Sequence, residues 1–432
     1  MTEHGHAVVL GAGMGGLLAA RVLADAYDRV TVIERDRLPG TAGNRRGVPQ
    51  GRHVHALLPR GAAIVDELFP GLLAELVADG AETIEDYSLL HFAPGGHRLC
   101  REMRLPTTYQ PSRPFLEAHV RERVRALPNV EIRDGCAVAG LTTTPDRRRV
   151  TGVRVDAGSP ETIAADLVVD ALGRGARTPA WLTELGYPRP EEREVPVRLR
   201  YTSALVRLRP RAVPEKLVVI GATPDRPTGM GLFAYEHDTW LFTVAGYGDR
   251  RPSPDLPGMI GFVADRVPKH VEKALREAEP LSDVATFAFP ASRWRRYDRL
   301  RRFPEGLLVF GDAICSFNPL YGQGMSVAAL EAQALRRCVR RGGDHLARRF
   351  FRASAGPIGV AWRLAVGGDL ALPEVEAPRP LAVRLSNRYV ERVLTAAERD
   401  PVLAARFMRV SAFVDPPSAL LRPSAVARAL AG

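Results

Sequence analysis

A glycine-rich segment near the start of the chain constrains the fold more than any other feature. The residues Gly11-Ala-Gly13-Met-Gly15-Gly16 lie between a short apolar run at 7–10 and a second apolar segment at 17–26. In this spacing the first glycine permits a tight turn, the second lets a phosphate group approach the backbone, and Gly16 lets a helix pack closely on a strand. The pattern predicts a strand, a glycine turn and a helix whose free N–H groups bind the phosphates of a dinucleotide.

A second strand supports this interpretation. Residues 29–34 read Arg-Val-Thr-Val-Ile-Glu, and a run so rich in β-branched residues is typical of a buried parallel strand. Glu34 ends this run, where a carboxylate can accept hydrogen bonds from the ribose hydroxyls of an adenosine. We therefore include Glu34 and the neighbouring Arg35 among the candidate cofactor contacts. This motif alone does not distinguish NAD from FAD.

A further motif far downstream favours FAD. Residues 306–313 read Gly-Leu-Leu-Val-Phe-Gly-Asp-Ala, and residues 322–325 read Gly-Gln-Gly-Met. The pattern predicts a strand that ends near Asp312 and a helix over 326–337. Asp312 can bind a polyol hydroxyl, and the amides of Gly324 and Met325 can stabilise negative charge on the N1–C2=O edge of a flavin. Because a nicotinamide dinucleotide has no ribityl chain for such an aspartate, we expect non-covalent FAD.

Over nearly its whole length the sequence resembles the group A flavoprotein monooxygenases, the para-hydroxybenzoate hydroxylase-like family. Residues 311–312 match the second FAD motif of that family, and residues 45–51, Arg-Arg-Gly-Val-Pro-Gln-Gly, resemble the segment beside the isoalloxazine ring. The resemblance implies that Arg45 approaches the phosphates, and that Arg113 and the backbone of Val138 also contact FAD. The candidate cofactor contacts are Gly11, Gly13, Gly15, Gly16, Glu34, Arg35, Arg45, Gly47, Val48, Arg113, Val138, Gly311, Asp312, Gly322, Gln323, Gly324 and Met325.

The middle motif of the family is altered in this chain. Residues 170–174 read Asp-Ala-Leu-Gly-Arg, with Leu172 where the family has an aspartate that contacts FAD and NAD(P)H. The apolar strand and the glycine are retained. Arg174 and Arg177 could serve the phosphates of a reductant, or they could bridge loop carbonyls and carboxylates.

The order of the motifs predicts an α/β fold with two interleaved parts. Residues 1–194 and 291–356 form a Rossmann-like FAD-binding domain in two pieces, and the runs at 198–208, 217–220 and 239–246 favour an inserted, mostly antiparallel substrate-binding sheet over 195–290. Residues 357–432 form a C-terminal helical region with proline-rich joints, beginning at Pro357. We also expect helices over 53–68, 114–127 and 260–278.

Within the family, the segments 51–58, 293–300 and 318–324 are most similar to bacterial natural-product tailoring hydroxylases and epoxidases. The resemblance implies an FAD-dependent monooxygenase in which NADH or NADPH acts as a transient reductant and O2 is captured as a flavin C4a-hydroperoxide. The expected substrate is a large, mostly apolar secondary metabolite of polyketide or terpenoid type, which is epoxidised or hydroxylated. The alternative is an FAD-dependent reductase of the geranylgeranyl-reductase type, which acts on an alkene without O2. A halogenase of this fold is disfavoured, because no two tryptophans stand two residues apart and no lysine precedes Lys216.

The chemistry of such an enzyme belongs to the flavin, so we assign no certain catalytic side chain. Asn318, Pro319 and Tyr321 are candidates for shaping a loop beneath the ring. We interpret His53 and His55 as structural rather than as general bases. Alternating aromatics on a half-buried sheet are typical either of a core or of a substrate chamber. The candidates for lining the chamber are Tyr201, Phe233, Tyr235, Trp240 and Phe242.

Charge, apolar runs and cysteine spacing limit which partners the protein is expected to bind and in which cellular compartment it is expected to lie. The formal charge of +11 comes almost entirely from arginine spread along the chain, which argues against nucleic-acid binding. The expected partners are an apolar small molecule, O2 and NAD(P)H. No run reaches the roughly 18 apolar residues of a membrane-spanning helix, and the four cysteines form no CxxC pair. We expect a cytoplasmic monomer or homodimer without a disulfide or a structural metal.

Overall fold

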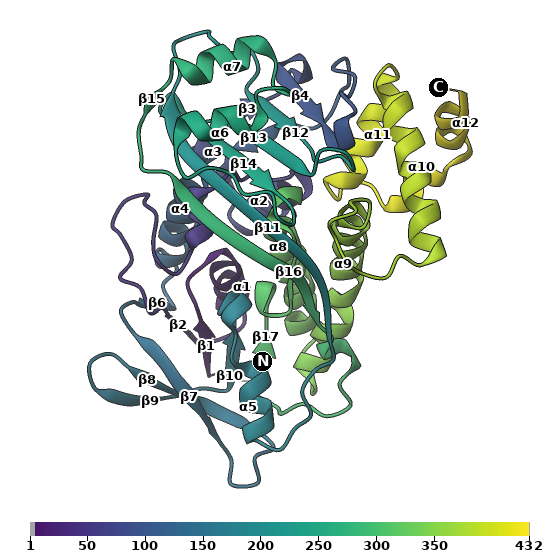
Figure 1. Ribbon diagram of the computed structural model, residues 1–432. Helices are drawn as coiled ribbons and strands as arrows, with labels where there is room; N and C mark the ends of the chain where they lie inside the picture. Colours follow the sequence, from purple (N-terminus) through teal and green to yellow (C-terminus); the bar gives the residue numbers. More distant parts are fainter. Residues whose placement is uncertain (1–4, 432) are drawn as a thin grey trace.

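The computed structural model describes residues 5–431, and its first sheet contains the predicted dinucleotide-binding strands (Figure 1). Five parallel strands stand in the order β17–β10–β1–β2–β6, so segments far apart in the sequence lie side by side. Residues 1–4 and 432, at the ends of the first and last predicted segments, lie outside the described part. The strands are β1 (His6–Leu10), β2 (Arg29–Ile33), β6 (Val130–Arg133), β10 (Leu167–Asp170) and β17 (Leu307–Val309).

Both faces of this sheet are covered. Successive side chains of a strand point to opposite faces. Ala7 and Val9 accordingly belong to a core shared with helices, whereas Val8 and Leu10 pack with β8 and α5. Burial on both sides explains why β1 is apolar from Ala7 to Leu10. The helices of the first layer are α1 (Met14–Ala24), α2 (Pro59–Leu68), α4 (Arg113–Arg125) and α8 (Gly324–Arg340). The opposite layer consists of α5 (Thr178–Glu184), β7 (Ala137–Thr143), β8 (Val150–Asp156) and β9 (Pro160–Ala164).

An eight-stranded sheet lies above the first one in the view of Figure 1. Its strand order is β18–β16–β11–β14–β13–β12–β4, with β15 paired to β11. Within it β4 and β12 pair in parallel, and the other pairs are antiparallel. The sheet takes in β4 and β18 from outside residues 195–290. Its strands are β4 (Leu90–Ala93), β11 (Glu192–Arg207), β12 (Leu217–Ile220), β13 (Thr228–Tyr235), β14 (Thr239–Gly246), β15 (Glu279–Pro280), β16 (Ala285–Arg295) and β18 (Cys315–Ser316).

Two helices cover one face of the eight-stranded sheet. They are α6 (Leu256–Val263) and α7 (Lys269–Arg276), where the sequence predicted a single helix over 260–278. The single helix was wrong because Pro268 stands between them: it has no N–H to donate and its ring obstructs the preceding turn. Pro268 instead immediately precedes α7.

The C-terminal residues are helical, as predicted. Figure 1 shows α10–α12 beside β4 and β12, and their apolar side chains form one core with that sheet. Pro357 lies inside α9 rather than at a joint, so the predicted boundary there was wrong. No helix within residues 5–431 is long and apolar enough to span a bilayer. The helices are α9 (Leu346–Asp369), α10 (Leu381–Ala397), α11 (Pro401–Ser411) and α12 (Pro423–Ala431).

The helix predicted over 53–68 begins later than expected. Residues 49–52 form the 3-10 turn η1 (Pro49–Arg52), and α2 starts only at Pro59, which is well suited to a first helical position because its missing N–H would be unpaired there. The predicted fold class is confirmed: a Rossmann-like domain, an additional mostly antiparallel sheet and a helical C-terminal region. The remaining elements are α3 (Leu72–Ala78), β3 (Glu82–Ile84) and β5 (Thr108–Gln110).

Candidate functional site

The glycine turn between β1 and α1 has the geometry that phosphate binding requires. Gly11 has φ +99°, and a Cβ there would lie 2.8 Å from the carbonyl oxygen of Ala171. A Cβ at Gly16 would overlap the carbonyl of Gly11, so the helix packs directly on the turn. At Gly13 a Cβ would meet only the Arg45 guanidinium, at 3.8 Å. Free space beside Gly13, at the uncapped start of α1, is what a pyrophosphate would occupy.

Arg45 is held beside this turn by short hydrogen bonds to two acidic side chains and one backbone carbonyl. Its Nη1 donates to Glu34 Oε2 at 2.9 Å, its Nε to Glu117 Oε1 at 2.8 Å, and its Nη2 to the carbonyl of Ala12 at 3.0 Å. Glu34 Oε2 also accepts the N–H of Ala12 at 2.9 Å. Arg113 donates to the other oxygen of Glu117 at 3.1 Å. The structure therefore brings together Glu34, Arg45 and Arg113 at the mouth of the glycine turn.

Of the other residues predicted to contact the adenosine end of FAD, most lie near the end of β2, but one does not contact the site. The N–H of Gly47 donates to Asp36, which ties the segment before η1 to the end of β2, and Val48 directly precedes η1. Val138 lies on β7, two residues after Cys136, whose N–H donates to the carbonyl of Glu34 at 2.8 Å. Arg35 differs, because its side chain is 68% exposed and approaches only Asp36, at 4.0 Å.

The second motif lies against the first. A Cβ at Gly15 would be 4.0 Å from Cα of Gly311, which begins the turn η6 (Gly311–Ala313). The half-buried carboxylate of Asp312 has no hydrogen-bond partner within residues 5–431. Burial raises the pKa of Asp312, and the charges of Arg113 and Arg174 act against that rise. Asp312 is thus a free acceptor near two arginines, which suits a polyol hydroxyl.

The start of α8 offers free backbone donors next to open space. No side chain caps the helix, and a Cβ at Gly322 or Gly324 would meet nothing within 4 Å. Gln323 and Met325 are both buried, and Oε1 of Gln323 lacks a partner among the described residues. A flavin edge with negative charge fits such a helix start. These residues, together with the turn at Gly13, fit FAD.

Glu331 is a residue of this site that the sequence reasoning did not identify. It is fully buried on α8, and its Oε2 accepts the N–H of Gly311 at 2.7 Å. Burial raises the pKa of Glu331 to about 8, and the nearby Asp312 adds to the effect. The available signal was an acid among alanines on the inner face of an apolar helix. Glu331 holds the turn that presents Asp312.

In the loop after β10, position 172 is a leucine, whereas the family that the sequence resembles has an aspartate there. Hydrogen bonds to Asp170 hold this loop instead. The buried Asp170 accepts the N–H of Leu172 at 3.1 Å and the hydroxyl of Thr178. Arg174 crosses to the second sheet, where its guanidinium lies 4.1 Å above the ring of Phe289. Arg177 points elsewhere, 5.8 Å above the ring of Trp181 on α5. Arg174 is therefore the arginine that faces the interface between the two sheets.

Both predicted histidines join the flavin-side segment to the eight-stranded sheet. Nδ1 of His53 lies 2.7 Å from Ser203 Oγ, and its ring meets the edge of Tyr201 at 4.4 Å. The backbone of His55 exchanges hydrogen bonds with the hydroxyl of Tyr235. Burial lowers the pKa of His53 to about 3 and that of His55 to about 4, so both rings are neutral near pH 7.

The predicted aromatic residues divide between two faces of the sheet. Phe233 pairs with Leu241 across the β13–β14 ladder, so it points opposite to Phe242. Tyr201, Phe233 and Tyr235 lie on the side of His53 and the C-terminal helices. Trp240 and Phe242 instead pack with α6 and α7. These two lie on the opposite face from the other three, because a strand turns alternate residues to opposite faces. Trp240 and Tyr235 nevertheless both border one surface cavity.

The predicted loop residues are tied to a buried acid. Asn318 begins the turn η7 (Pro319–Tyr321), and its Nδ2 donates to Asp369 Oδ1 at 2.7 Å. The hydroxyl of Tyr321 donates to the same oxygen at 3.1 Å. Asp369 ends α9 and is fully buried, and this burial raises its pKa to about 7. The sequence reasoning did not identify Asp369, because nothing in the helical tail marks it as an inward-facing acid.

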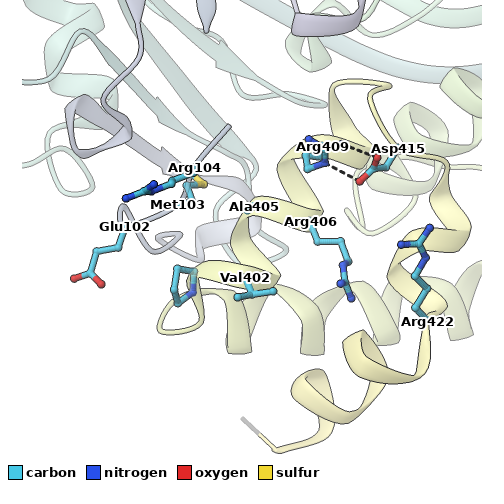
Figure 2. Close-up of a pocket in the computed structure, with 10 residues that line it drawn as sticks. Glu102, Met103, Arg104, Val402, Ala405, Arg406, Arg409, Asp415 and Arg422 are labelled. Carbon is cyan, nitrogen blue, oxygen red and sulfur yellow. Dashed lines mark hydrogen bonds and ion pairs between the residues drawn. The ribbon is translucent and has the colours of Figure 1, made fainter. Parts of the chain in front are cut away.

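Two surface cavities lie away from the predicted cofactor residues. Figure 2 shows the larger, of about 450 Å³, which is lined by Met103, Arg104, residues of α11 and the Arg409–Asp415 ion pair. None of the predicted cofactor or substrate residues lines it. The second, of about 380 Å³, is bordered by Tyr235 and Trp240 among mostly charged and polar side chains.

Comparisons with known proteins agree with this geometry. The family model described as "Pyridine nucleotide-disulphide oxidoreductase" matches residues 5–224, more than half of the chain. The chain belongs to this family. The oxidoreductase is also 43% identical to the Mycobacterium tuberculosis protein Rv3254 over 95% of this chain and 90% of that protein. It is 28% identical to a Salinispora arenicola kynurenine 3-monooxygenase, over 79% of this chain and 73% of the relative.

Solved structures show the same fold. The flavin-dependent brominase Bmp2 matches the oxidoreductase with a TM-score of 0.69 at 15% identity, over 94% of this chain and 93% of that one. PqsL of P. aeruginosa, solved with 2-aminobenzoylacetate, gives 0.65 at 18% identity, over 95% and 100%. The predicted resemblance to group A FAD-dependent monooxygenases is confirmed, as is the prediction of an FAD-dependent enzyme of that class.

Proposed function

We propose that this oxidoreductase is a monooxygenase that uses NADH or NADPH and O2 to epoxidise or hydroxylate a large, mostly apolar secondary metabolite. One observation carries the proposal. The starts of α1 and α8 both lack a side-chain cap, and the unpartnered carboxylate of Asp312 belongs to the turn that packs against α1. This arrangement lies against the aromatic face of the second sheet, where Arg174 and Tyr201 stand. A cofactor site open to an apolar wall suits transfer of oxygen to an apolar compound.

The residues of the site have distinct roles in this proposal. Bound FAD supplies the redox and oxygen chemistry. The start of α1 holds the pyrophosphate, Asp312 holds the ribityl hydroxyls, and the first amides of α8 stabilise charge at the N1–C2=O edge. Tyr201 and Phe289, which belong to one apolar cluster, help to exclude water from the reacting ring. Residues 195–290 serve as the substrate-binding part of the molecule.

The named relatives support the reaction class. A kynurenine 3-monooxygenase matches most of the chain, whereas PqsL and Bmp2 share its fold at low identity. Bmp2 is a brominase, so the fold alone does not exclude halogenation. We prefer oxygenation because the chain has no lysine before Lys216 and no two tryptophans two residues apart in the sequence.

The deciding experiment measures O2 consumption and the incorporation of oxygen from O2 into the product. The purified full-length protein should be yellow, with FAD that heat releases, and it should consume O2 and NADH or NADPH when an apolar polyene or fused-ring compound is supplied. With ¹⁸O2 the product should carry one labelled oxygen atom. A colourless protein that binds NAD⁺ but shows no flavin spectrum after reconstitution with FAD would refute the proposal. Reduction of an alkene under nitrogen, without label from O2, would identify the alternative reductase.

A further inference from the structure

Four polar side chains that the proposed chemistry does not use meet at the buried end of α9. They are Asp369 of α9 itself, and Asn318, Tyr321 and Tyr247 from other segments. Asp369 Oδ1 accepts from Asn318 Nδ2 at 2.7 Å, from the hydroxyl of Tyr321 at 3.1 Å and from that of Tyr247 at 3.5 Å. Asn318 Nδ2 also donates to Tyr247 at 2.9 Å. The second oxygen, Oδ2, is buried and has no partner among the described residues. All the donors therefore meet one oxygen of the acid.

This one-sided arrangement fits a neutral carboxylic acid better than a carboxylate. In the neutral form Oδ1 is a carbonyl oxygen with two acceptor positions, and Oδ2 carries the proton. An ionised group would leave half of its charge on a bare, buried oxygen, which is costly without a compensating partner. The bond to Tyr247 is long and weak, so Asn318 and Tyr321 are the main donors.

The surroundings of Asp369 also disfavour a negative charge. It is the last residue of α9, where the partial negative charge of the helix end repels an anion. No arginine, lysine or histidine of residues 5–431 forms an ion pair with it. Two arginines flank it along the chain. Arg363, six residues earlier on α9, forms no ion pair with it, and Arg379 donates to the backbone carbonyls of Leu370, Leu372 and Val375.

The other titratable groups packed here supply no positive charge. Tyr247 from the end of β14 and Tyr321 from η7 are held neutral, because burial raises the pKa of each well above its usual value. Glu374, in the segment after α9, is a further acid with a buried, unpartnered oxygen. The neutral Asn387 of α10 donates through Nδ2 to the carbonyl of Gly367 at 2.9 Å.

We propose that Asp369 is a positioning residue that is protonated on Oδ2 in the folded protein below neutral pH and anchors the 318–322 loop to α9. The loop is held at both ends, because Asn318 opens η7 and Tyr321 closes it. Gly322 follows at once and leads into α8, whose first amides face the proposed flavin edge. This role for the loop rests on the proposed function, whereas the state of the acid does not.

The first test measures thermal unfolding of the full-length protein without added FAD from pH 5 to 9. The folded protein keeps a proton on Asp369 that the unfolded chain releases above about pH 4, so the contribution of Asp369 to stability falls as pH rises toward 7. Asp369→Asn cannot titrate. Its melting temperature should therefore rise relative to wild type between pH 5 and 7.5 and level off above pH 8. Asp249→Asn, at an exposed aspartate two residues after Tyr247, is the matched control and should show a constant difference.

A flat difference for Asp369→Asn across this range would show that Asp369 is ionised throughout and would overturn the inference. Tyr321→Phe provides a second check on the acid. The Tyr321 hydroxyl stabilises the ionised form of Asp369, so its removal should move the transition to higher pH. A Tyr321→Phe transition at lower pH would contradict the assigned donor.

The anchoring role is measured by FAD affinity. Asp369→Ala removes the acceptor for Asn318 and Tyr321, and the loss of two hydrogen bonds should weaken FAD binding by about 10- to 100-fold. Asp369→Asn keeps an acceptor at Oδ1 and should bind within about threefold of wild type. Unchanged affinity in Asp369→Ala would remove the link between α9 and the cofactor loop. The oxygen-consumption assay is independent of both measurements, so failure of the monooxygenase proposal remains distinguishable.

Discussion

Asp312 is the single side chain on which the FAD assignment depends most. Its carboxylate has no partner of its own, so a bound ribityl hydroxyl would supply its first hydrogen bond. Asp312→Ala should weaken FAD binding by about 10- to 150-fold, the equivalent of losing about 1.5–3 kcal/mol for a charge-assisted bond. Fluorescence titration of the stripped protein with FAD measures this. Equal affinity in the variant and wild type would reduce Asp312 to a turn residue.

The two histidines provide a test of the substrate class at the residue scale. Both rings are neutral. The His53 ring bonds Ser203 of the second sheet, whereas the His55 ring bonds the carbonyl of His53 and only its backbone reaches Tyr235. An alkene has no proton to lose before oxygen transfer. His53→Gln and His55→Gln variants with full FAD should therefore keep turnover within about tenfold, since only orientation is disturbed. A thousandfold loss with normal flavin reduction would instead point to a phenol and to a histidine base.

The same histidines should make the fold sensitive to acid. Their pKa values are lowered in the folded protein to about 3 and about 4, so the unfolded chain takes up protons first as pH falls below about 6.5. Stability should decline toward pH 4, with a slope of up to about 1.4 kcal/mol per pH unit for each histidine. Chemical denaturation of His53→Gln at several pH values should show a shallower decline. An identical decline would mean that His53 is solvated.

At the scale of the strand, the sheet face on which a residue lies decides whether its side chain packs in the protein core or can line the substrate chamber. Phe242 is fully buried against α6 and α7. Phe242→Ala should therefore destabilise the protein by about 3–5 kcal/mol, while the KM for the apolar substrate stays unchanged. Tyr201→Phe, on the opposite face, is the comparison and should affect KM with little loss of stability. A change of KM in Phe242→Ala beyond that in Tyr201→Phe would place Phe242 in the chamber.

Local sequence patterns predicted the elements around the cofactor better than those elsewhere. Gly11, Gly16 and Asp312 could be identified because a turn or a free acceptor demands those residue types wherever the fold occurs. The start of α2 at Pro59 and the break at Pro268 were missed because apolar periodicity continues across both positions. The roles of Glu331 and Asp369 depend on which helix face meets a distant loop, and that is set by tertiary packing rather than by local spacing.

For the whole molecule, FAD should act as a stabilising ligand. A group that binds only the folded state adds about 2.7 kcal/mol at a concentration of 100 times its Kd. The melting temperature should therefore rise with added FAD in wild type. In Gly13→Val a branched side chain would fill the space beside the turn, so the rise should disappear. A rise of equal size in Gly13→Val would show that FAD binds somewhere else.

The parallel sheet also has a consequence for the order in which the protein is made. β1 and β2 leave the ribosome first, but their neighbour β17 and the start of α8 follow only after residue 306. Synthesis at roughly 5–20 residues per second separates these events by at least about 15 seconds. A nascent chain therefore contains the glycine turn between β1 and α1 long before it contains the second part of the proposed FAD site, at β17 and the start of α8. FAD should be captured late, when translation is nearly complete, and chains that stop before residue 324 should remain without flavin.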